Sequence, residues 1–230
     1  MLLQYVDFLR KVALFSELDD AQLEQLAGVV REQHYKKNTT LFHIDDPGNA
    51  LFILKNGLVK ITIEDQSGRE IILRMLYPTD FFGEMSLIDD MPRSATVSTL
   101  EPSDAMLIYR DSFINLIEKN PKILLNMTVV LSRRLRRVNE LIRSLAFHDV
   151  YGKVARVLLN LAREKGRVTD DGTVIDLRLT QQELAELAGM SRETMTRTLR
   201  DFQQAGCVRI ESGIITILEI GMLQREINIT

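Results

Sequence analysis

Residues 180–199 read TQQELAELAGMSRETMTRTL, and this stretch decides the fold of the C-terminal part of the chain. Thr180 and Glu183 have the spacing of a capping box, in which the two side chains bind free backbone N–H groups at the start of a helix. We expect that helix to end at Gly189, which permits a tight turn, and a second helix to begin after Ser191, a good N-cap residue. Two helices joined by such a turn form a helix-turn-helix, an arrangement that binds DNA.

The second of these helices has two different faces. Met195, Leu199 and Phe202 share one face and are expected to anchor the helix to a core. The opposite face is polar, and there arginine can bind guanine through two hydrogen bonds and a carboxylate can accept one from cytosine N4. Alternatively, this is a solvated face on which Glu193 and Arg197 form an i,i+4 pair. A hairpin expected over residues 208–218 would be the wing of a winged helix, and it favours DNA contacts from Arg192, Glu193, Thr196, Arg197 and Arg200.

The residues before this motif also have helical and strand-like patterns. Asp149 is a good N-cap for a helix over residues 150–164, whose apolar residues fall on one face. Residues 166–172 are expected to form a polar loop, and residues 173–179 (TVIDLRL) are expected to form a strand.

A long helix is predicted between residues 120 and 147. Asn120 as N-cap and Pro121 at the first helical position make a good helix start. A heptad-like stripe follows, apolar at all but one of its positions: Leu124, Thr128, Leu131, Leu135, Val138, Ile142 and Leu145. Such a stripe must be buried, either on the strand-rich part of this chain or on a second copy. We favour a homodimer through residues 120–145, because two-fold symmetry is the commonest in oligomers.

Residues 39–109 are rich in short strand-like runs. The runs LFHI, ALFIL, LVKITIE, EIILRML, ATVSTL and AMLIY are separated by turn residues. Many short strands at near-regular spacing predict a sandwich or a rolled barrel. Asn56-Gly57 is the strongest hairpin signal among the turns, since both residues tolerate positive φ. Before these runs, residues 5–31 are expected to form short helices, with Asp19 or Asp20 as a cap.

A candidate ligand site lies within residues 81–97. Gly83 lets the backbone approach a ligand closely, and Glu84 can accept a hydrogen bond from a sugar hydroxyl. Arg93 offers its guanidinium to a phosphate, and Ser94 adds a hydroxyl donor beside it. By their chemistry alone, these residues are equally compatible with a structural ion pair between Glu84 and Arg93.

The composition is that of an ordinary globular protein and excludes several classes. The chain has 230 residues, with 29 Lys and Arg against 32 Asp and Glu, and one cysteine, Cys207. A single cysteine excludes an intrachain disulfide framework and a cysteine-held iron–sulfur cluster, and it fits a reducing compartment. No catalytic motif is present, such as a Walker loop or an HExxH helix, so we expect neither an enzyme nor a metal site. No segment is long and apolar enough to span a membrane, which predicts a cytoplasmic protein.

The charge is unevenly distributed along the chain. Residues 1–118 carry 11 basic and 19 acidic side chains, residues 119–147 carry 7 and 1, and residues 148–230 carry 11 and 12. The overall charge of −3 does not favour binding to DNA by bulk charge. We therefore expect DNA affinity to depend on a few placed arginines.

Four stretches together resemble the Crp–Fnr superfamily of bacterial transcription regulators. Residues 81–97 (FFGEMSLIDDMPRSATV) are similar to the phosphate-binding cassette of cyclic-nucleotide-binding domains, and residues 130–135 (VLSRRL) are similar to the family's long helix. Residues 145–162 (LAFHDVYGKVARVLLNLA) are similar to its hinge and the helix after it, and residues 179–199 to its recognition motif. The resemblance implies an α+β fold, with a β-roll (double-stranded β-helix, or jelly-roll) sensor domain over residues 1–118, a long dimerisation helix over 119–147 and a winged helix-turn-helix over 148–230.

The resemblance also implies sites and partners. Cyclic AMP or a related cyclic nucleotide would bind as an allosteric effector, with no obligatory cofactor, and the site would comprise Gly83, Glu84, Met85, Ser86, Arg93, Ser94 and Asn139. Arg192, Glu193 and Arg197 would read a palindromic, TGTGA-like site on double-stranded DNA. RNA polymerase would be a further partner.

The long helix departs from the cyclic-AMP pattern at the positions that contact adenine. The cyclic-AMP-responsive archetype of the family carries threonine followed by serine there, and this chain has Val138 and Asn139. Valine has no hydrogen-bonding side chain, whereas asparagine keeps a donor and an acceptor. Other effectors therefore stay open, including cyclic GMP and a cyclic dinucleotide, as does DNA binding without any nucleotide.

Overall fold

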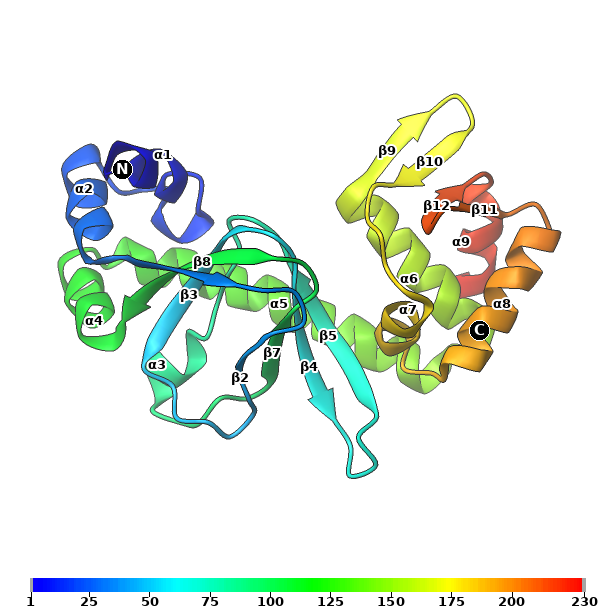
Figure 1. Cartoon of the computed structure of the whole chain (residues 1–230), viewed down its shortest axis with the longest axis horizontal. Coiled ribbons are helices and arrows are strands. Elements are labelled where there is room, and N and C mark those ends of the chain that lie inside the picture. Colours follow the sequence, from blue (N-terminus) through cyan, green and yellow to red (C-terminus); the bar gives the residue numbers. More distant parts are fainter. Residues whose placement is uncertain (1, 229–230) are drawn as a thin grey trace. The chain divides into compact units, whose positions relative to one another are not determined.

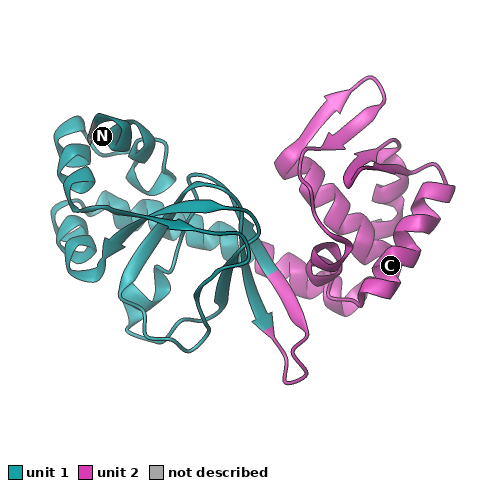
Figure 2. Cartoon of the chain, viewed as in Figure 1, with its two compact units in different colours: residues 1–63, 73–136 teal, residues 64–72, 137–230 magenta. Residues whose placement is uncertain are grey.

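The chain folds into two compact units, as a computed structural model shows for residues 2–228 (Figures 1 and 2). The first unit comprises residues 1–63 and 73–136, and the second comprises residues 64–72 and 137–230. The helix α5 (Lys122–Phe147) contributes to both units. The architecture is the α+β fold that the sequence predicts: a β-roll, a long helix and a helix-turn-helix with a wing.

Two four-stranded sheets form the β-roll (Figure 1). One sheet has the strand order β1-β8-β3-β6, and the other has the order β2-β7-β4-β5. Strands that follow one another in the sequence alternate between the two sheets, except for β4 and β5, which are neighbours in the same sheet. The strands are β1 (Arg31–Tyr35), β2 (Thr40–Phe42), β3 (Ala50–Asn56), β4 (Val59–Glu64), β5 (Glu70–Leu76), β6 (Phe81–Phe82), β7 (Thr96–Thr99) and β8 (Ser103–Tyr109).

Strand β3 is buried on both of its faces. Successive side chains point to opposite sides of a strand. Phe52 and Leu54 accordingly pack with Val97 of β7 between the two sheets, whereas Leu51 and Ile53 pack in the cluster that contains the helices of this unit. A strand buried in this way has a continuous apolar sequence, which is what ALFIL shows.

Helices cover the outer face of this sheet. They are α1 (Leu2–Leu9), the 3₁₀ turn η1 (Ala13–Phe15), α2 (Asp20–Val29) and α4 (Arg110–Lys119). Asp19, one of the two predicted caps, accepts a hydrogen bond from the N–H of Gln22 at 2.9 Å and completes a capping box. Strand β1 was not predicted, because its residues are mostly polar and exposed. Helix α4 was also not predicted, although Phe113, Leu116 and Ile117 have helical spacing.

Two local predictions in this unit are wrong. Asn56-Gly57 does not close a two-residue hairpin, because β3 and β4 lie in different sheets and Gly57 alone has a positive φ (91°). Asn120 ends α4 rather than capping α5: its N–H binds the carbonyl oxygens of Leu116 and Ile117, and its side-chain amide donates to Leu116. The residues around each position do not determine whether the turn closes a hairpin or whether the asparagine begins or ends a helix. Both results depend on which distant segment packs against the position.

The second unit is a winged helix. It contains α6 (Val150–Lys165), α7 (Gln181–Ala188), α8 (Arg192–Gln204) and α9 (Ile220–Asn228), with a sheet of order β11-β12-β10-β9. Its strands are β9 (Gly166–Thr169), β10 (Gly172–Ile175), β11 (Val208–Glu211) and β12 (Ile214–Ile217). Asp149 caps α6 as expected, accepting from the N–H of Gly152 at 2.8 Å.

The segment before α7 differs from the prediction. Residues 166–169, expected in a loop, form β9, and the strand expected over residues 173–179 ends at Ile175. Strand β9 has little apolar pattern, and its Val168 is exposed, so its own sequence does not indicate a strand. It forms through its pairing with β10. Helix α9, which follows the wing, was also not predicted.

The long helix α5 buries one stripe and exposes another. Ile123 and Met127 pack in the core of the first unit. The predicted heptad stripe instead leaves large apolar side chains open to solvent in the single chain: Leu124 is 43% exposed, Leu135 is 62% exposed and Ile142 is 58% exposed. Within the heptad stripe, Leu131 packs partly against the core of the first unit, whereas Leu124, Leu135 and Ile142 do not.

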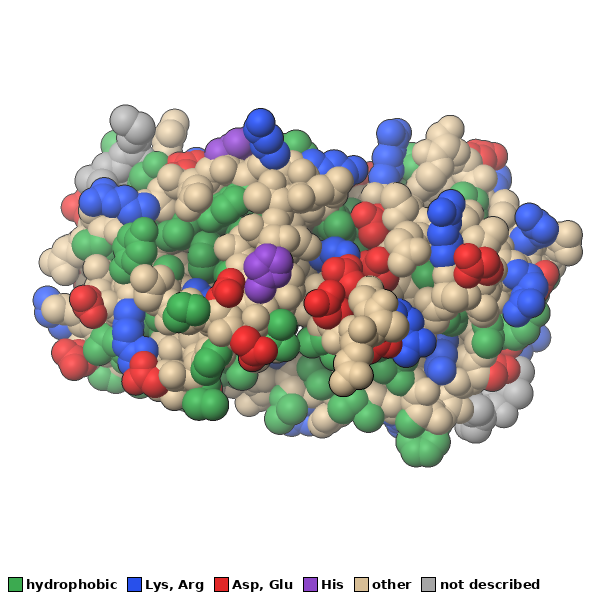
Figure 3. Space-filling model, turned by 60° about the horizontal axis from the view of Figure 1, so that its bottom comes forward, with side chains coloured by type: hydrophobic (Ala, Val, Ile, Leu, Met, Phe, Trp, Pro, Cys, Tyr) green, Lys and Arg blue, Asp and Glu red, His purple; other side chains and the backbone are tan. Residues whose placement is uncertain are grey.

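Charges of both signs are mixed on the surface. On the face drawn in Figure 3, basic and acidic side chains lie interspersed among polar and apolar ones, and neither sign covers the face. Among the described residues, no helix is long and apolar enough to cross a membrane.

Candidate functional site

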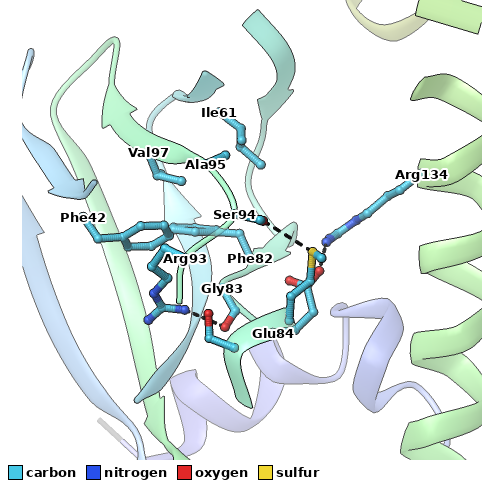
Figure 4. Close-up of a pocket in the computed structure, with 12 residues that line it drawn as sticks. Phe42, Ile61, Phe82, Gly83, Glu84, Arg93, Ser94, Ala95, Val97 and Arg134 are labelled. Atoms are coloured by element: carbon cyan, nitrogen blue, oxygen red, sulfur yellow. Dashed lines mark hydrogen bonds and ion pairs between the residues drawn. The ribbon is translucent and has the colours of Figure 1, made fainter. Parts of the chain in front are cut away.

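A pocket opens in the β-roll beside the turn that carries Gly83 and Glu84 (Figure 4). Its empty volume is about 390 Å³. The lining combines an apolar side with a polar, charged side, as small-molecule sites usually do. The lining residues are Phe42, Ile61, Phe82, Gly83, Glu84, Met85, Ser86, Arg93, Ser94, Ala95, Val97 and Arg134. Six of the seven predicted ligand-site residues therefore lie together.

Arg93 is a buried guanidinium that is neutralised by no ion pair within residues 2–228. It is only 4% exposed, and it donates to the carbonyl oxygens of Gly83 at 2.7 Å and Ala50 at 3.0 Å. It also lies 4.3 Å from the ring centroid of Phe42. Its Nε is buried and has no hydrogen-bond partner in the described chain. Burial lowers the pKa of Arg93 below its ordinary value, while the charge of Glu84 opposes that shift.

Gly83 is required by this arginine as well as by the turn. Its φ is +78°, a conformation that side chains with a Cβ rarely adopt. A Cβ built at Gly83 would lie 2.6 Å from Nη1 of Arg93, closer than real contacts allow. The glycine thus makes space for the Arg93 guanidinium, whereas the sequence suggested only the approach of a ligand.

Glu84 pairs with a residue that the sequence did not reveal. The carboxylate of Glu84 is buried, and Arg134 of α5 donates to it at 2.8 Å. Arg134 also donates to the carbonyl oxygen of Phe81 and lies 4.3 Å from the Phe81 ring centroid. The alternative ion pair between Glu84 and Arg93 is therefore wrong. Arg134 lies seven residues after Met127, on the stripe that packs on the roll, and this spacing was the available signal.

The other predicted ligand residues differ in how they are placed. Ser86 is buried, Met85 and Ser94 are exposed at the rim, and the Ser94 hydroxyl lies 3.6 Å from the Met85 sulfur. Asn139 is exposed on α5 and is not part of the lining described for one chain.

The helix-turn-helix is built as its local sequence indicates. Thr180 accepts from the N–H of Glu183 at 3.1 Å, and the Glu183 carboxylate accepts from the N–H of Thr180 at 2.6 Å. Gly189 ends α7 with φ +63°, and Ser191 caps α8 by accepting from the N–H of Thr194. These contacts determine where α7 begins and ends and where α8 begins.

Helix α8 turns a polar face outward. Met195, Leu199 and Phe202 are buried in the core of the winged helix. The opposite side lines a hollow of about 850 Å³, formed by Arg192, Glu193, Thr196, Arg197, Arg200 and Gln181. The structure thus brings all five predicted DNA-contacting residues to one surface. Gln181, from the first turn of α7, was not predicted.

Glu193 stays ionised on this surface. Its own backbone N–H and the Ser191 hydroxyl hold the pKa of its carboxyl below the ordinary value. An ionised carboxylate can only accept hydrogen bonds, as contact with cytosine N4 requires. The N-terminus of a helix also favours a negative charge at this position.

A β-roll that holds a polar pocket, followed by a winged helix-turn-helix, defines a class of ligand-responsive transcription regulators. Comparison with known proteins agrees: the cyclic nucleotide-binding domain matches residues 32–120, and the Crp-like helix-turn-helix domain matches residues 152–226. The chain belongs to the Crp–Fnr family of DNA-binding transcription regulators, whose characterised members are regulators and not enzymes.

Individual relatives are similar over most of the chain. The CRP-like cAMP-activated global transcriptional regulator of Mycobacterium tuberculosis is 33% identical over 219 residues, which are 95% of this chain and 98% of that protein. The cAMP-activated global transcriptional regulator CRP of Pasteurella multocida is 35% identical over 86% of this chain and 95% of its own length. The solved structure of the c-di-GMP-responsive global regulator CLP of Xanthomonas campestris matches with a TM-score of 0.76 and 28% identity, over 86% of this chain and 99% of that one.

Proposed function

We propose that this protein is a homodimeric transcription regulator whose binding to a palindromic DNA site is gated by a cyclic nucleotide, with cyclic AMP the first candidate. The sensor would comprise residues 1–118, the dimerisation helix residues 119–147 and the DNA-binding domain residues 148–230. The observation that carries the proposal is Arg93, a buried cation that lines the pocket and whose Nε has no partner among the described residues.

The pocket residues fit the phosphate and sugar of a cyclic nucleotide. A buried arginine without a carboxylate partner favours an anion, and its guanidinium suits a phosphate through two hydrogen bonds. Ser94 at the rim would add a hydroxyl donor, with Gly83, Met85 and Ser86 forming the wall beside it. Glu84 would accept from a ribose hydroxyl while keeping its contact with Arg134.

Coupling to DNA would act through α5. Arg134 joins the pocket to α5, and Leu145 near the end of the same helix lies against Gly189, where an added Cβ would approach its Cδ2 to 2.6 Å. A ligand shifts the balance between two states only by binding one of them more tightly. A nucleotide that binds Glu84 while Glu84 stays paired with Arg134 would thus favour one position of α5.

A second copy is the best partner for the exposed stripe of α5. Leu135 and Ile142 are more than half exposed and lie at heptad spacing, as in the seam between two helices. Asn139 lies four residues after Leu135 and three before Ile142, on the same side of α5, so a dimer would bring it to the interface. There it would contact the base, together with Val138.

In the dimer, two copies of α8 would enter successive major grooves, about 34 Å apart. Arg192 and Arg197 would bind guanines and Glu193 would accept from cytosine, which suits a TGTGA-like half-site. Thr196 and Arg200 complete the contact surface. RNA polymerase would be a further partner. A protein that acts on DNA together with RNA polymerase in a bacterium would be located in the cytoplasm.

The alternative effector is a cyclic dinucleotide. Val138 replaces a hydrogen-bonding residue at the base end, and CLP, described as c-di-GMP-responsive, shares the fold at 28% identity. A regulator that binds DNA without nucleotide is the other candidate. The Glu84 carboxylate, which would accept from a ribose hydroxyl, already forms an ion pair with Arg134 in the single chain.

Calorimetric titration of the purified full chain tests the proposal. We expect saturable binding of cyclic AMP, with weaker binding of linear AMP, whose phosphate geometry differs. Cyclic GMP and cyclic di-GMP form the comparison set. Tighter binding of cyclic di-GMP would identify the alternative effector, and no binding of any of them would leave the nucleotide-independent regulator.

A further inference from the structure

The outward face of α8 has a polar residue at its centre whose hydroxyl is already engaged. Thr196 lies four residues from both Arg192 and Arg200, on the stripe that lines the hollow. Its Oγ1 lies 2.5 Å from Oε1 of Gln181 and 2.8 Å from the carbonyl oxygen of Arg192. A hydroxyl has one proton. That proton therefore has two acceptors inside the protein, and the side that Thr196 turns toward the hollow offers oxygen lone pairs.

Gln181 is connected to Thr196 by a hydrogen bond between the two helices of the motif. It is the first residue of α7, directly after the capping box of Thr180 and Glu183. Its oxygen is engaged by Thr196, and within residues 2–228 its amide nitrogen donates to no partner. Gln181 is exposed and lines the hollow beside Thr196, so its amide nitrogen is accessible to a DNA base.

Together the two side chains present a donor next to an acceptor. Adenine offers the complementary pattern in the major groove, with N7 as acceptor and the N6 amino group as donor. A free glutamine can bind adenine with its own oxygen and nitrogen. Here the glutamine oxygen is engaged, so the Thr196 oxygen takes over the acceptor role.

We propose that Gln181 is a specificity-determining residue of the DNA-binding surface, and that the pair Gln181–Thr196 selects adenine at one position of each half-site. The inference rests on the proposed sequence-specific DNA binding. It assigns to α7 a base contact in addition to those of α8. A residue at the edge of the surface would contact only the sugar-phosphate backbone of the DNA. Gln181, in contrast, is hydrogen-bonded to Thr196 at the centre of the stripe.

Selection from a pool of DNA duplexes with randomised symmetric half-sites tests this, using the full chain with and without saturating cyclic AMP. For the wild type we expect adenine at one half-site position. Gln181→Leu should reduce that preference about tenfold and leave the other positions unchanged, as expected for loss of one base contact. Gln181→Glu, which can only accept, should shift the preference toward cytosine, whose N4 is a donor.

Two controls separate base selection from other roles. Gln182→Leu alters the neighbouring residue, which bonds Glu186 and does not line the hollow, and it should keep the wild-type preference. In the Thr196→Val background, Gln181→Leu should cause no further change, because the pair acts as a unit.

Three outcomes would overturn the assignment. An equal loss of affinity for all sequences in Gln181→Leu would make Gln181 a backbone contact, and an unchanged preference in both Gln181 variants would give it no role. If the wild type selects no sequence under either condition, the proposed function fails and this assignment fails with it. The first two outcomes, observed with a clear site selected by the wild type, overturn the assignment alone.

Discussion

The pocket and the DNA-binding surface are built in opposite ways. The pocket takes residues from three separated stretches, residues 42–61, 82–97 and Arg134, and it buries both Arg93 and Glu84. The DNA-binding surface takes five of its six residues from one helix, α8, and its arginines are exposed. Changes in the pocket should therefore affect ligand binding and folding together, whereas changes on α8 should affect DNA binding alone.

The largest effect is expected from Arg93→Ala. This change removes the charged donors for a phosphate, and because such hydrogen bonds contribute about 1.5–3 kcal/mol each, losing two should weaken cyclic AMP binding at least about 100-fold. It also leaves buried carbonyl oxygens of Gly83 and Ala50 without a donor, so the melting temperature should fall. Calorimetric titration and thermal unfolding measure the two effects. Arg69→Ala, at an exposed arginine on the β4–β5 turn, is the control, and similar affinities in both variants would contradict the pocket assignment.

A smaller effect is expected from Arg197→Ala. Loss of one bidentate contact to guanine should weaken binding to the selected site by about 1–3 kcal/mol, or roughly 5- to 150-fold, and relax the preference at one position. The melting temperature should not change, since the side chain is exposed. Fluorescence anisotropy with labelled duplex measures the affinity. Arg163→Ala on α6 removes the same charge elsewhere, and an equal loss in that variant would show that only bulk charge matters.

Gly189→Ala should destabilise the winged helix by about 2 kcal/mol. Alanine in the left-handed region costs roughly 1–2 kcal/mol, and its Cβ would crowd Leu145. In the Leu145→Ala background, only the backbone part of the cost should persist. Scanning calorimetry of the four variants forms a double-mutant cycle. A cost that is the same in both backgrounds would show that α5 does not press on this turn.

The smallest effect is expected at the cap of α6. Asp149→Ala removes the acceptor for the N–H of Gly152 and should lower the free energy of unfolding by about 1 kcal/mol. Asp149→Asn keeps an acceptor and should be nearly neutral. Urea denaturation compares the two variants. An equal loss in both would show that the charge of Asp149, rather than its hydrogen bond, stabilises the helix.

The DNA-binding surface, which is built from one continuous stretch, could be predicted from the sequence more fully than the pocket, which is built from separated stretches. The capping box of Thr180, the turn at Gly189 and the caps Ser191 and Asp149 are all local, since each signal lies within four residues of its partner. A helix face follows from spacing alone. Accordingly, α7, α8 and the polar stripe of α8 were predicted with their residues, and the structure confirms these elements.

The features that were missed depend on distant segments. The partner of Glu84 is 50 residues away, on a helix whose orientation against the roll no short pattern reveals. The turn at Asn56-Gly57 was interpreted as a hairpin because the local residues favour one, yet β3 pairs with β8 and β6. Gln181 was missed because its importance comes from a contact across the turn to Thr196.

In the proposed mechanism, the pocket controls the DNA-binding surface. The most direct test is the affinity of the full chain for its selected DNA site, measured by fluorescence anisotropy without and with saturating cyclic AMP. We predict that the nucleotide tightens DNA binding about tenfold or more, and that DNA tightens nucleotide binding by the same factor, as linkage requires. The same DNA affinity under both conditions, for a chain that calorimetry shows to be saturated with nucleotide, would contradict the account.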